Sequence, residues 1–375
     1  MSVGVAILGS TGSIGCSTLH VLARQRERFR VVALTAHSNA ELLARQAAEW
    51  QPAYVGLVNS GKGEGGRGQG PECLVEAATH PDVRIVVNGV VGAAGLEATL
   101  AALRAGKRVA LANKETLVMA GELVTRAARE GGGEIVPVDS EHSAVLQCVA
   151  GRGPAELARL ILTASGGPFR TWPRERIAAA TVAEALRHPT WKMGKKITVD
   201  SATLVNKALE VIEAHFLFGL GYEAVEVVVH PQSVVHAFVE FVDGSVLAQV
   251  GFPTMELPIL YALTHPARVP DAGTRRFDPV AAGSLTFEAV DGELYPAYRL
   301  GRAAATAAGT APTVFNAANE IAVALFLEGA IPFGRIAQTI ARVLDTTAPT
   351  GADSLEAVLA ADAAARRLAR EAACS

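Results

Sequence analysis

An apolar run at Val3–Leu8 leads directly into the glycine-rich segment Gly9–Gly15, which reads GSTGSIG. Glycine lets the backbone approach a pyrophosphate, and the start of a following helix offers free N–H groups and the positive end of the helix dipole. The spacing GxxGxxG is a variant of the usual GxGxxG, and a plain turn between strand and helix is the alternative interpretation. Its position at the first strand of a βαβ series favours a dinucleotide-binding site.

Short apolar runs alternate with helical stretches throughout residues 1–138. Strands are expected at Val3–Leu8, Arg30–Thr35, Ala53–Val58, Val83–Asn88, Arg108–Ala112 and Glu134–Val138. This alternation predicts an α/β domain with a doubly wound, Rossmann-like parallel sheet.

The rest of the chain differs in pattern. Strand-like runs in residues 139–263 include several that follow one another without helical crossovers, which predicts a central α+β domain with a smaller, largely antiparallel sheet. These runs are Leu160–Ala164, Val225–His230, Val234–Phe241 and Ser245–Val250. Residues 264–294, rich in Pro, Gly and Asp, are expected to be a linker, and the Ala-rich residues 295–375 a C-terminal helical bundle.

Composition and charge exclude several classes of protein. With 50% hydrophobic and 19% charged residues, the chain has ample material for buried cores and is not a disordered protein. A net charge of −3 gives no sign of a nucleic-acid-binding protein. No apolar stretch reaches ~18 residues and no basic region precedes Val3, so neither a membrane span nor a signal peptide is expected. The four cysteines form no CxxC, which fits a reducing cytoplasm rather than a disulfide framework or a zinc cluster.

The end of the second expected strand bears on the choice of nucleotide. An NAD site usually places Asp or Glu there, ~20 residues past the glycines, to hold the ribose 2′-hydroxyl. This chain has His37, Ser38 and Asn39 instead. No carboxylate repels a 2′-phosphate and three polar side chains can bond to one, which favours NADP. Capping of the next helix by Ser38 or Asn39 is the other role these residues can have.

Lys114 follows the fifth expected strand, at the edge where parallel α/β sheets bind ligands. A lysine there can neutralise and hydrogen-bond a substrate oxygen. The alternative is an ordinary surface lysine at the start of a helix. The strand-end position and the scarcity of lysine, with 7 Lys against 27 Arg in the chain, together favour a functional role.

Asp139 and Glu141 follow the sixth expected strand and offer two hard oxygen ligands on one short turn. With a third carboxylate they would suit Mg²⁺ or Mn²⁺ rather than zinc. Two acids at a strand end are also typical of a solvated turn, and a lone His142 beside them is typical of a structural residue. Glu210 would complete the set, with Glu213 one turn further on as an exposed or supporting residue.

Residues 200–213 are expected to form a helix in which Asn206, Lys207 and Glu210 share one face of an otherwise apolar surface. Such a polar stripe avoids hydrocarbon, so it either faces water or lines a polar pocket. The helix alone leaves both interpretations open. In a pocket, Asn206 and Lys207 with the nearby Ser201 would bind a phosphate or phosphonate.

A long loop is expected between Gly166 and Gly194. Ser165 places a hydroxyl at its start, and Trp191 and Met193 lie near its end. Large apolar side chains on a loop usually pack locally. They can also form a lid that excludes water from a reaction.

Blocks spread over nearly the whole chain carry a family resemblance. They are GSTGSIG at Gly9, LANKE at Leu111, PVDSEH at Pro137, ASGGPF at Ala164, HPTWKMGKK at His188, VDSATLVNKALE at Val199, VHPQS at Val229 and FNAANE at Phe315. Together they resemble the 1-deoxy-D-xylulose 5-phosphate reductoisomerase family, which makes 2-C-methyl-D-erythritol 4-phosphate in non-mevalonate isoprenoid synthesis. Many members carry Gly-Lys-Asn or Arg-Ser-Asn where this chain has His37-Ser38-Asn39.

The resemblance implies cofactors and a role for each matching residue. NADPH and a divalent cation are implied, the cation being Mg²⁺ or Mn²⁺ with Co²⁺ as a further alternative. NADPH contacts are implied for Thr11, Gly12, Ser13, Ile14, Asn113, Glu115 and Gly194, and cation ligation for Asp139, Glu141 and Glu210. Lys114, Ser140 and Glu141 would address the carbonyl and hydroxyl end of a phosphorylated sugar, with Lys114, Glu141 and Glu210 as catalytic groups that contact it. Ser165, His188, Ser201, Asn206 and Lys207 would hold its phosphate end under Trp191 as a lid.

The resemblance further implies a homodimer in which residues 139–263 supply both the catalytic groups and the dimer contact. Two other functions stay open from the residues alone. One is an NADP dehydrogenase without isomerisation, of the semialdehyde or homoserine kind, although a semialdehyde enzyme needs a nucleophilic Cys and Cys148 lies in an apolar stretch. The other is an inactive NADP-binding sensor, against which the three carboxylates and Lys114 argue. Rearrangement by retroaldol–aldol cleavage and by an α-ketol shift are equally compatible with the sequence.

Overall fold

The computed structural model describes residues 2–59, 68–191 and 193–374. The six glycines among residues 61–70 predict a surface loop, but most of this stretch lies outside the described residues. The chain divides into two compact units, each made of several segments. Unit 1 comprises residues 1–116, 123–146 and 254–276, and unit 2 comprises residues 117–122, 147–253 and 277–375.

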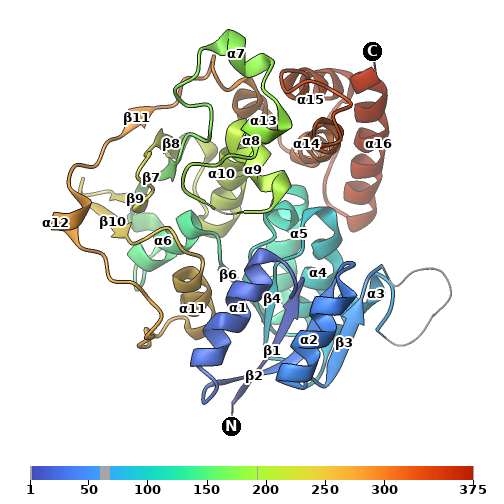
Figure 1. The fold of residues 1–375 in the computed structure, drawn as a ribbon, viewed down its shortest axis with the longest axis vertical. Coiled ribbons are helices and arrows are strands. Elements are labelled where there is room, and N and C mark those ends of the chain that lie inside the picture. Colours follow the sequence, from blue (N-terminus) through green and yellow to red (C-terminus); the bar gives the residue numbers. More distant parts are fainter. Residues whose placement is uncertain (1, 60–67, 192, 375) are drawn as a thin grey trace. The chain divides into compact units, whose positions relative to one another are not determined.

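Unit 1 contains a six-stranded sheet in the order β3-β2-β1-β4-β5-β6, and every pair in it is parallel (Figure 1). Its strands are β1 (Val3–Leu8), β2 (Phe29–Ala36), β3 (Tyr54–Leu57), β4 (Ile85–Asn88), β5 (Arg108–Leu111) and β6 (Glu134–Pro137). The strand order reverses between β1 and β4, which is the switch point where doubly wound sheets bind ligands. The expected Rossmann-like domain is confirmed.

Helices connect these strands and cover the sheet. They are α1 (Ser13–Arg24), α2 (Ala40–Trp50), α3 (Glu72–Thr79), α4 (Leu96–Arg104), α5 (Lys114–Gly131), α6 (Ser140–Cys148) and, from a later part of the chain, α11 (Glu256–Thr264). Val5 and Ile7 of β1 pack in one apolar cluster with Leu22 of α1 and Ile259 of α11. Burial of that face fixes where β1 ends and therefore where the glycine turn begins.

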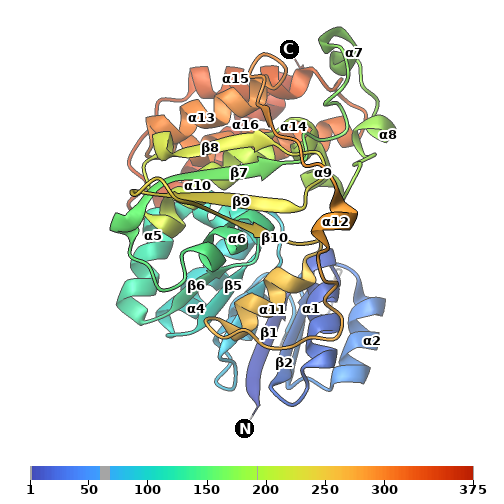
Figure 2. The same cartoon turned by 90° about the vertical axis from the view of Figure 1, so that its left-hand side faces the viewer.

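Unit 2 contains a five-stranded sheet in the order β10-β9-β7-β8-β11 (Figure 2). Its strands are β7 (Leu157–Ala164), β8 (Val225–Val229), β9 (Val235–Phe241), β10 (Val246–Val250) and β11 (Glu288–Ala289). Three of its four strand pairs are antiparallel, as expected, but β7 and β8 are parallel. The helices between β7 and β8 provide the crossover that a parallel pair needs.

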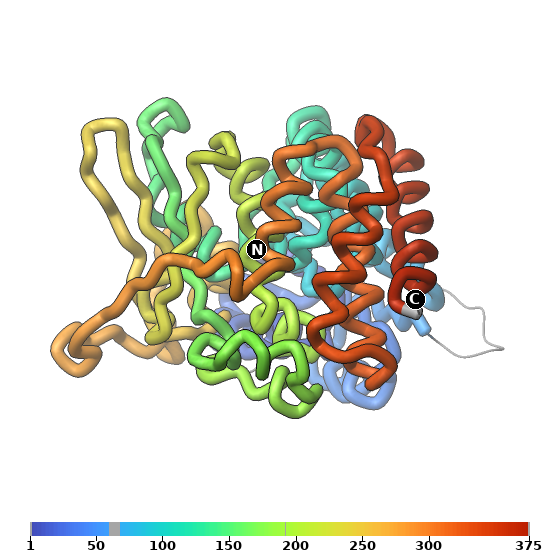
Figure 3. Tube along the Cα trace, turned by 90° about the horizontal axis from the view of Figure 1, so that it is seen from above, coloured from blue at the N-terminus to red at the C-terminus, as the bar shows by residue number. Residues whose placement is uncertain are grey.

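The other side of unit 2 is helical (Figure 3). The helices of unit 2 are α7 (Arg174–Ala178), α8 (Val182–Ala185), α9 (Lys195–Ala202), α10 (Val205–Phe218), α12 (Pro279–Ala282), α13 (Pro296–Ala307), α14 (Ala311–Leu327), α15 (Arg335–Thr346) and α16 (Leu355–Cys374), of which the short α12 lies on the strand side. One large core joins α10 to the C-terminal helices through side chains such as Leu209, Phe315 and Ile340. The expected C-terminal helical region is confirmed. Among the described residues, no helix is long and apolar enough to cross a lipid bilayer.

Candidate active site

The glycine turn follows β1 directly. Gly9 adopts φ +81°, and a Cβ on Gly15 would lie 2.4 Å from the Gly9 carbonyl oxygen, so neither position tolerates a larger residue well. Helix α1 then begins after Gly12 with no side-chain cap and no acidic residue in its first turn. Its first N–H groups and positive dipole therefore suit a phosphate. Thr11 and Ile14 are half-buried here, and Ser13 is exposed.

The segment after β2 is fully at the surface, with His37, Ser38 and Asn39 all exposed. Asn39 caps α2, because its Oδ1 accepts a hydrogen bond of 3.1 Å from the Leu42 N–H. Helix capping is thus one role of Asn39. His37 and Ser38 are placed at the same carboxyl edge of the sheet as the glycine turn.

Asn113 and Glu115 are buried at the end of β5, 1% and 5% exposed. The Asn113 amide nitrogen donates to the carbonyls of Val90 and Gly92, at 2.9 Å each, and to Glu115 Oε2 at 3.0 Å. Asn113 therefore fixes the loop after β4 beside the switch point. It can shape a cofactor site through that loop.

Lys114 and Asp139 form a buried ion pair across the neighbouring ends of β5 and β6. Lys114 Nζ lies 2.7 Å from Asp139 Oδ2, and the two side chains are 7% and 18% exposed. Ser140 donates a hydrogen bond of 2.6 Å to Glu141 Oε2. Lys114, Asp139, Ser140 and Glu141 are thus gathered at one edge of unit 1, and His142, which follows Glu141 in the chain, is completely buried.

Glu210 lies in unit 2, on α10, and is fully buried. Its two carboxylate oxygens accept hydrogen bonds from Asn206 Nδ2 and from Lys207 Nζ, the latter at 2.6 Å. The three polar residues of the expected stripe do share one face, and two of them, Lys207 and Glu210, are buried. Leu204, just before α10, adopts φ +54°, a strained conformation for a non-glycine residue and one typical of functional sites.

Two serines and a histidine converge in unit 2. His188 Nε2 lies 3.0 Å from Ser165 Oγ and 3.1 Å from Ser201 Oγ. These residues come from the end of β7, the loop before α9 and the last turn of α9. His188 is therefore within hydrogen-bonding distance of two serines, and the resemblance implies that all three residues hold a phosphate.

The backbone fixes the tautomer of His188. Its Nδ1 accepts hydrogen bonds from the N–H groups of Thr190 at 3.1 Å and Trp191 at 2.8 Å, so in the neutral ring the proton is on Nε2. Burial, and then the charge of Lys207, lower the pKa of His188 from 6.5 to about 4. Between those two values the unfolded chain binds a proton that the folded protein does not, so acidification in this window destabilises the fold. At neutral pH His188 is an uncharged donor.

Much of the expected loop between Gly166 and Gly194 is ordered by packing. It includes α7 and α8, and Phe169 within it is fully buried with its ring 5.0 Å from that of Phe333. Gly166 and Gly167 adopt positive φ, at +82° and +67°, whereas Gly194 has φ −61° and open space around it. Residues 165–173 and 186–191 form neither helix nor strand, and the second of these stretches contains His188 and Trp191.

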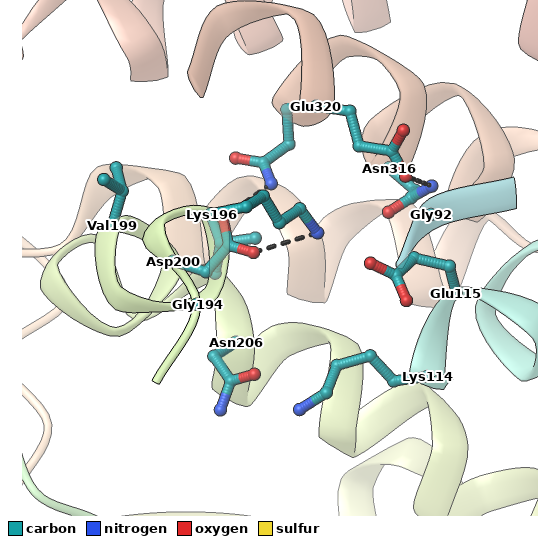
Figure 4. A network of polar contacts seen from close by, with 12 residues as sticks. Gly92, Lys114, Glu115, Gly194, Lys196, Val199, Asp200, Asn206, Asn316 and Glu320 are labelled. Atoms are coloured by element: carbon teal, nitrogen blue, oxygen red, sulfur yellow. Dashed lines mark hydrogen bonds and ion pairs between the residues drawn. The ribbon is translucent and has the colours of Figure 1, made fainter. Parts of the chain in front are cut away.

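A polar network between α9 and α14 was not expected from the sequence (Figure 4). Lys196 Nζ lies 2.9 Å from Asp200 Oδ2, and Asn319 Nδ2 donates a hydrogen bond of 2.8 Å to Asp200 Oδ1. Because Asp200 immediately precedes Ser201, this network holds the turn of α9 that presents the serine. Asn316 and Asn319, three residues apart on the largely apolar α14, were the available signal, since buried amides need polar partners.

Comparisons with known proteins agree with one another along the whole chain. A family model described as 1-deoxy-D-xylulose 5-phosphate reductoisomerase matches residues 5–121. Two models of the C-terminal domain of the same enzyme match residues 135–218 and 250–368.

Alignments with similar proteins include almost the whole of this chain and of each relative. The 1-deoxy-D-xylulose 5-phosphate reductoisomerase of Symbiobacterium thermophilum is 51% identical over 99% of each chain, and that of Geobacter sp. strain M21 is 51% identical over 98% of each. The solved structure of the Zymomonas mobilis enzyme with NADPH is 42% identical, with a TM-score of 0.90 and 99% coverage of each chain. A second reductoisomerase structure, with NADPH, fosmidomycin and magnesium, is 39% identical with a TM-score of 0.92, covering 99% of this chain and 98% of that one.

Proposed function

We propose a role in the reaction for each site residue, on the premise that the chain belongs to the 1-deoxy-D-xylulose 5-phosphate reductoisomerase family. The reaction is the NADPH- and divalent-metal-dependent rearrangement and reduction of 1-deoxy-D-xylulose 5-phosphate to 2-C-methyl-D-erythritol 4-phosphate. The observation that carries the function is 51% identity over 99% of the chain to a curated reductoisomerase.

The direct test is substrate-dependent loss of NADPH absorbance in the presence of Mg²⁺. We expect oxidation with 1-deoxy-D-xylulose 5-phosphate and none after EDTA treatment. Oxidation of NADPH with aspartate semialdehyde but not with the sugar phosphate would identify a plain dehydrogenase. Tight NADPH binding without turnover would identify a sensor.

The cation site is assigned to Asp139, Glu141 and Glu210. Three carboxylates and no thiolate form a hard donor set, which fits Mg²⁺ or Mn²⁺. When bound, the cation supplies Lewis acidity that polarises the ketone of the substrate and acidifies its neighbouring hydroxyl. Hydrogen-bonding partners hold these carboxylates in place: Lys114 for Asp139, Ser140 for Glu141, and Asn206 with Lys207 for Glu210.

The chain's cations and hydroxyls are assigned to binding and orientation. Lys114 donates to the reacting end of the substrate, where its buried charge stabilises a developing oxyanion. Ser165, Ser201 and His188 hold the phosphate. Because His188 is an uncharged Nε2–H donor, each serine hydroxyl can accept from it and turn its own proton toward a phosphate oxygen.

We expect the enzyme to prefer NADPH over NADH by about tenfold or more in kcat/KM. The second strand ends in His37, Ser38 and Asn39, with no carboxylate to repel the 2′-phosphate. The measurement is kcat/KM for each cofactor at saturating substrate. Equal values would show that this segment does not select the 2′-phosphate.

We further propose that the protein is a homodimer joined through the central residues 139–263. Strand β10 is an edge of the unit 2 sheet and is largely exposed, although it carries Val246, Leu247 and Val250. Exposed apolar edge strands are typical of sites that pair with another chain. A second copy presenting the same edge would satisfy the unpaired backbone groups.

Leu247→Lys is expected to weaken that dimer by about tenfold or more, because a buried charge would lie on the apolar edge. Analytical ultracentrifugation over a concentration series measures the change in dissociation constant. The exposed Val280, on α12, provides the control Val280→Lys, which should leave association unchanged. A wild-type protein that sediments as a monomer at all concentrations would contradict the assignment.

We also propose a cytoplasmic location. Among the described residues, Cys16 and Cys73 are free thiols, which is typical of proteins in a reducing compartment. Cell fractionation with an antibody to the chain tests this.

A further inference from the structure

The buried amide of Gln46 lies directly behind the glycine turn of unit 1. Gln46 is on α2 and only 6% exposed, and Ser10, within the turn, is fully buried. Ser10 Oγ donates to Gln46 Oε1 at 2.7 Å, and Gln46 Nε2 donates to the Ser10 carbonyl at 3.0 Å. The same nitrogen lies 3.9 Å from Cys16 Sγ, on the first turns of α1. One side chain thus bonds both the side chain and the backbone of the turn.

The opposite side of the turn is fixed by β2. The N–H groups of Gly9 and Ser10 both donate to the Thr35 carbonyl, at 3.1 and 2.7 Å. Ser10 is therefore held through its N–H, its carbonyl and its hydroxyl, and two of these three bonds depend on Gln46. Buried groups without such partners are costly, so Gln46 defines the position of the turn relative to α2.

Helix α2 links the same residue to the segment after β2. Asn39 caps α2 and Gln46 is seven residues later, which is almost two full turns and therefore the same face of the helix. The glycine turn would bind the pyrophosphate, and the segment His37–Asn39 would face the 2′-phosphate. The spacing between those two sites must match the spacing of the two groups within one NADPH molecule.

We propose that Gln46 is a positioning residue for the cofactor, which locks the glycine turn to α2 and thereby sets the spacing that discriminates NADPH from NADH. The proposal rests on the cofactor site assigned to this edge of unit 1. Gln46 acts through Ser10 and α2 rather than by touching the cofactor. A rigid spacing favours the cofactor that contacts both ends, because less ordering remains to be done on binding.

The test replaces Gln46 by Met in the full-length enzyme, which keeps the length of the side chain and removes both hydrogen bonds. Dissociation constants for NADPH and NADH are measured by titration calorimetry without substrate. We expect the NADPH constant to rise by about tenfold and the NADH constant by about threefold or less. Glu49→Met, on an exposed position of the same helix, is the matched control and should change neither.

Ser10→Ala separates the two bonds, because it removes the hydroxyl bond to Gln46 Oε1 and keeps the bond from Gln46 Nε2 to the Ser10 carbonyl. It should cause part of the loss, and it should add little in the Gln46→Met background. This milder variant also keeps the test decisive if Gln46→Met fails to fold.

Two results would overturn the proposal. Equal losses for NADPH and NADH would reduce Gln46 to general support of the turn, and unchanged constants with a lowered Tm would make its role purely structural. Neither result concerns the proposed function, which instead fails if the wild-type enzyme does not bind NADPH or does not oxidise it with 1-deoxy-D-xylulose 5-phosphate.

Discussion

Replacing Asp139 by Asn is expected to lower kcat by about 10³-fold while the dissociation constant for NADPH changes by about twofold or less. The substitution removes one of three carboxylates assigned to the cation and also leaves the buried Lys114 ammonium without its partner at 2.7 Å. Loss of a carboxylate ligand weakens binding of the cation that acts as Lewis acid. Without the Asp139 carboxylate, Lys114 is also no longer held where the oxyanion would form. Steady-state kinetics over a range of Mg²⁺ concentrations, with calorimetry for NADPH, measure the two effects.

The dependence on Mg²⁺ distinguishes ligand loss from a folding defect. If Asp139 holds the cation, the concentration of Mg²⁺ for half-maximal activity should rise in Asp139→Asn and in the corresponding Glu210→Gln variant. Glu130→Gln, at an exposed position on α5, is the control and should behave as wild type. Full turnover by the EDTA-treated wild-type enzyme would remove the cation from the mechanism.

The sheet of unit 1 could be predicted from the sequence because local pattern and tertiary structure agree there. Strands such as Val3–Leu8 are short, apolar and separated by amphipathic helices, so each one has a single way to be buried. The parallel pairing of β7 and β8 was harder, since it depends on a crossover through several helices. Nothing in the sequence of either strand specifies that neighbour.

In the candidate site, too, only some of the contacts could be predicted from the sequence. Lys114 and Asp139 could be placed together in advance, because both follow strands whose carboxyl ends meet at one edge. The partners of Asp200 and Ser10 could not, since Asn319 and Gln46 lie 119 and 36 residues away and their contacts depend on how helices pack. Patterns of strands and turns in the sequence therefore predict which reactive side chains lie at strand ends. The buried residues that position those side chains are identified only from the folded structure.

Trp191→Ala is expected to weaken binding of the substrate, or of a phosphonate–hydroxamate inhibitor, by about 30-fold, and binding of NADPH by less than about twofold. The backbone N–H of Trp191, which Trp191→Ala keeps, donates to His188 Nδ1, and His188 Nε2 lies within hydrogen-bonding distance of Ser165 and Ser201. The uncharged imidazole of His188 thus links Trp191, proposed as a lid, to the two serines proposed to hold the phosphate. The expected loss therefore comes from the indole, which would cover the bound substrate. Covering the site would exclude water and strengthen the electrostatics around the reacting oxygen. Calorimetric titration of each variant with inhibitor and with NADPH gives the two ratios.

Hydrogen exchange tests whether this segment closes or is permanently rigid. Because α7 and α8 already pack against the core, we expect slower exchange on inhibitor binding only in the amides of residues 187–194, and little change in residues 169–185. Trp172→Phe is the matched control, since the partly buried Trp172 ring lies 4.7 Å from that of Phe169 and packs against the core, so its replacement should lower Tm rather than inhibitor affinity. Equal protection of residues 187–194 with and without inhibitor would show that Trp191 is a fixed wall of the site, because a lid must exchange between open and closed states to admit its substrate.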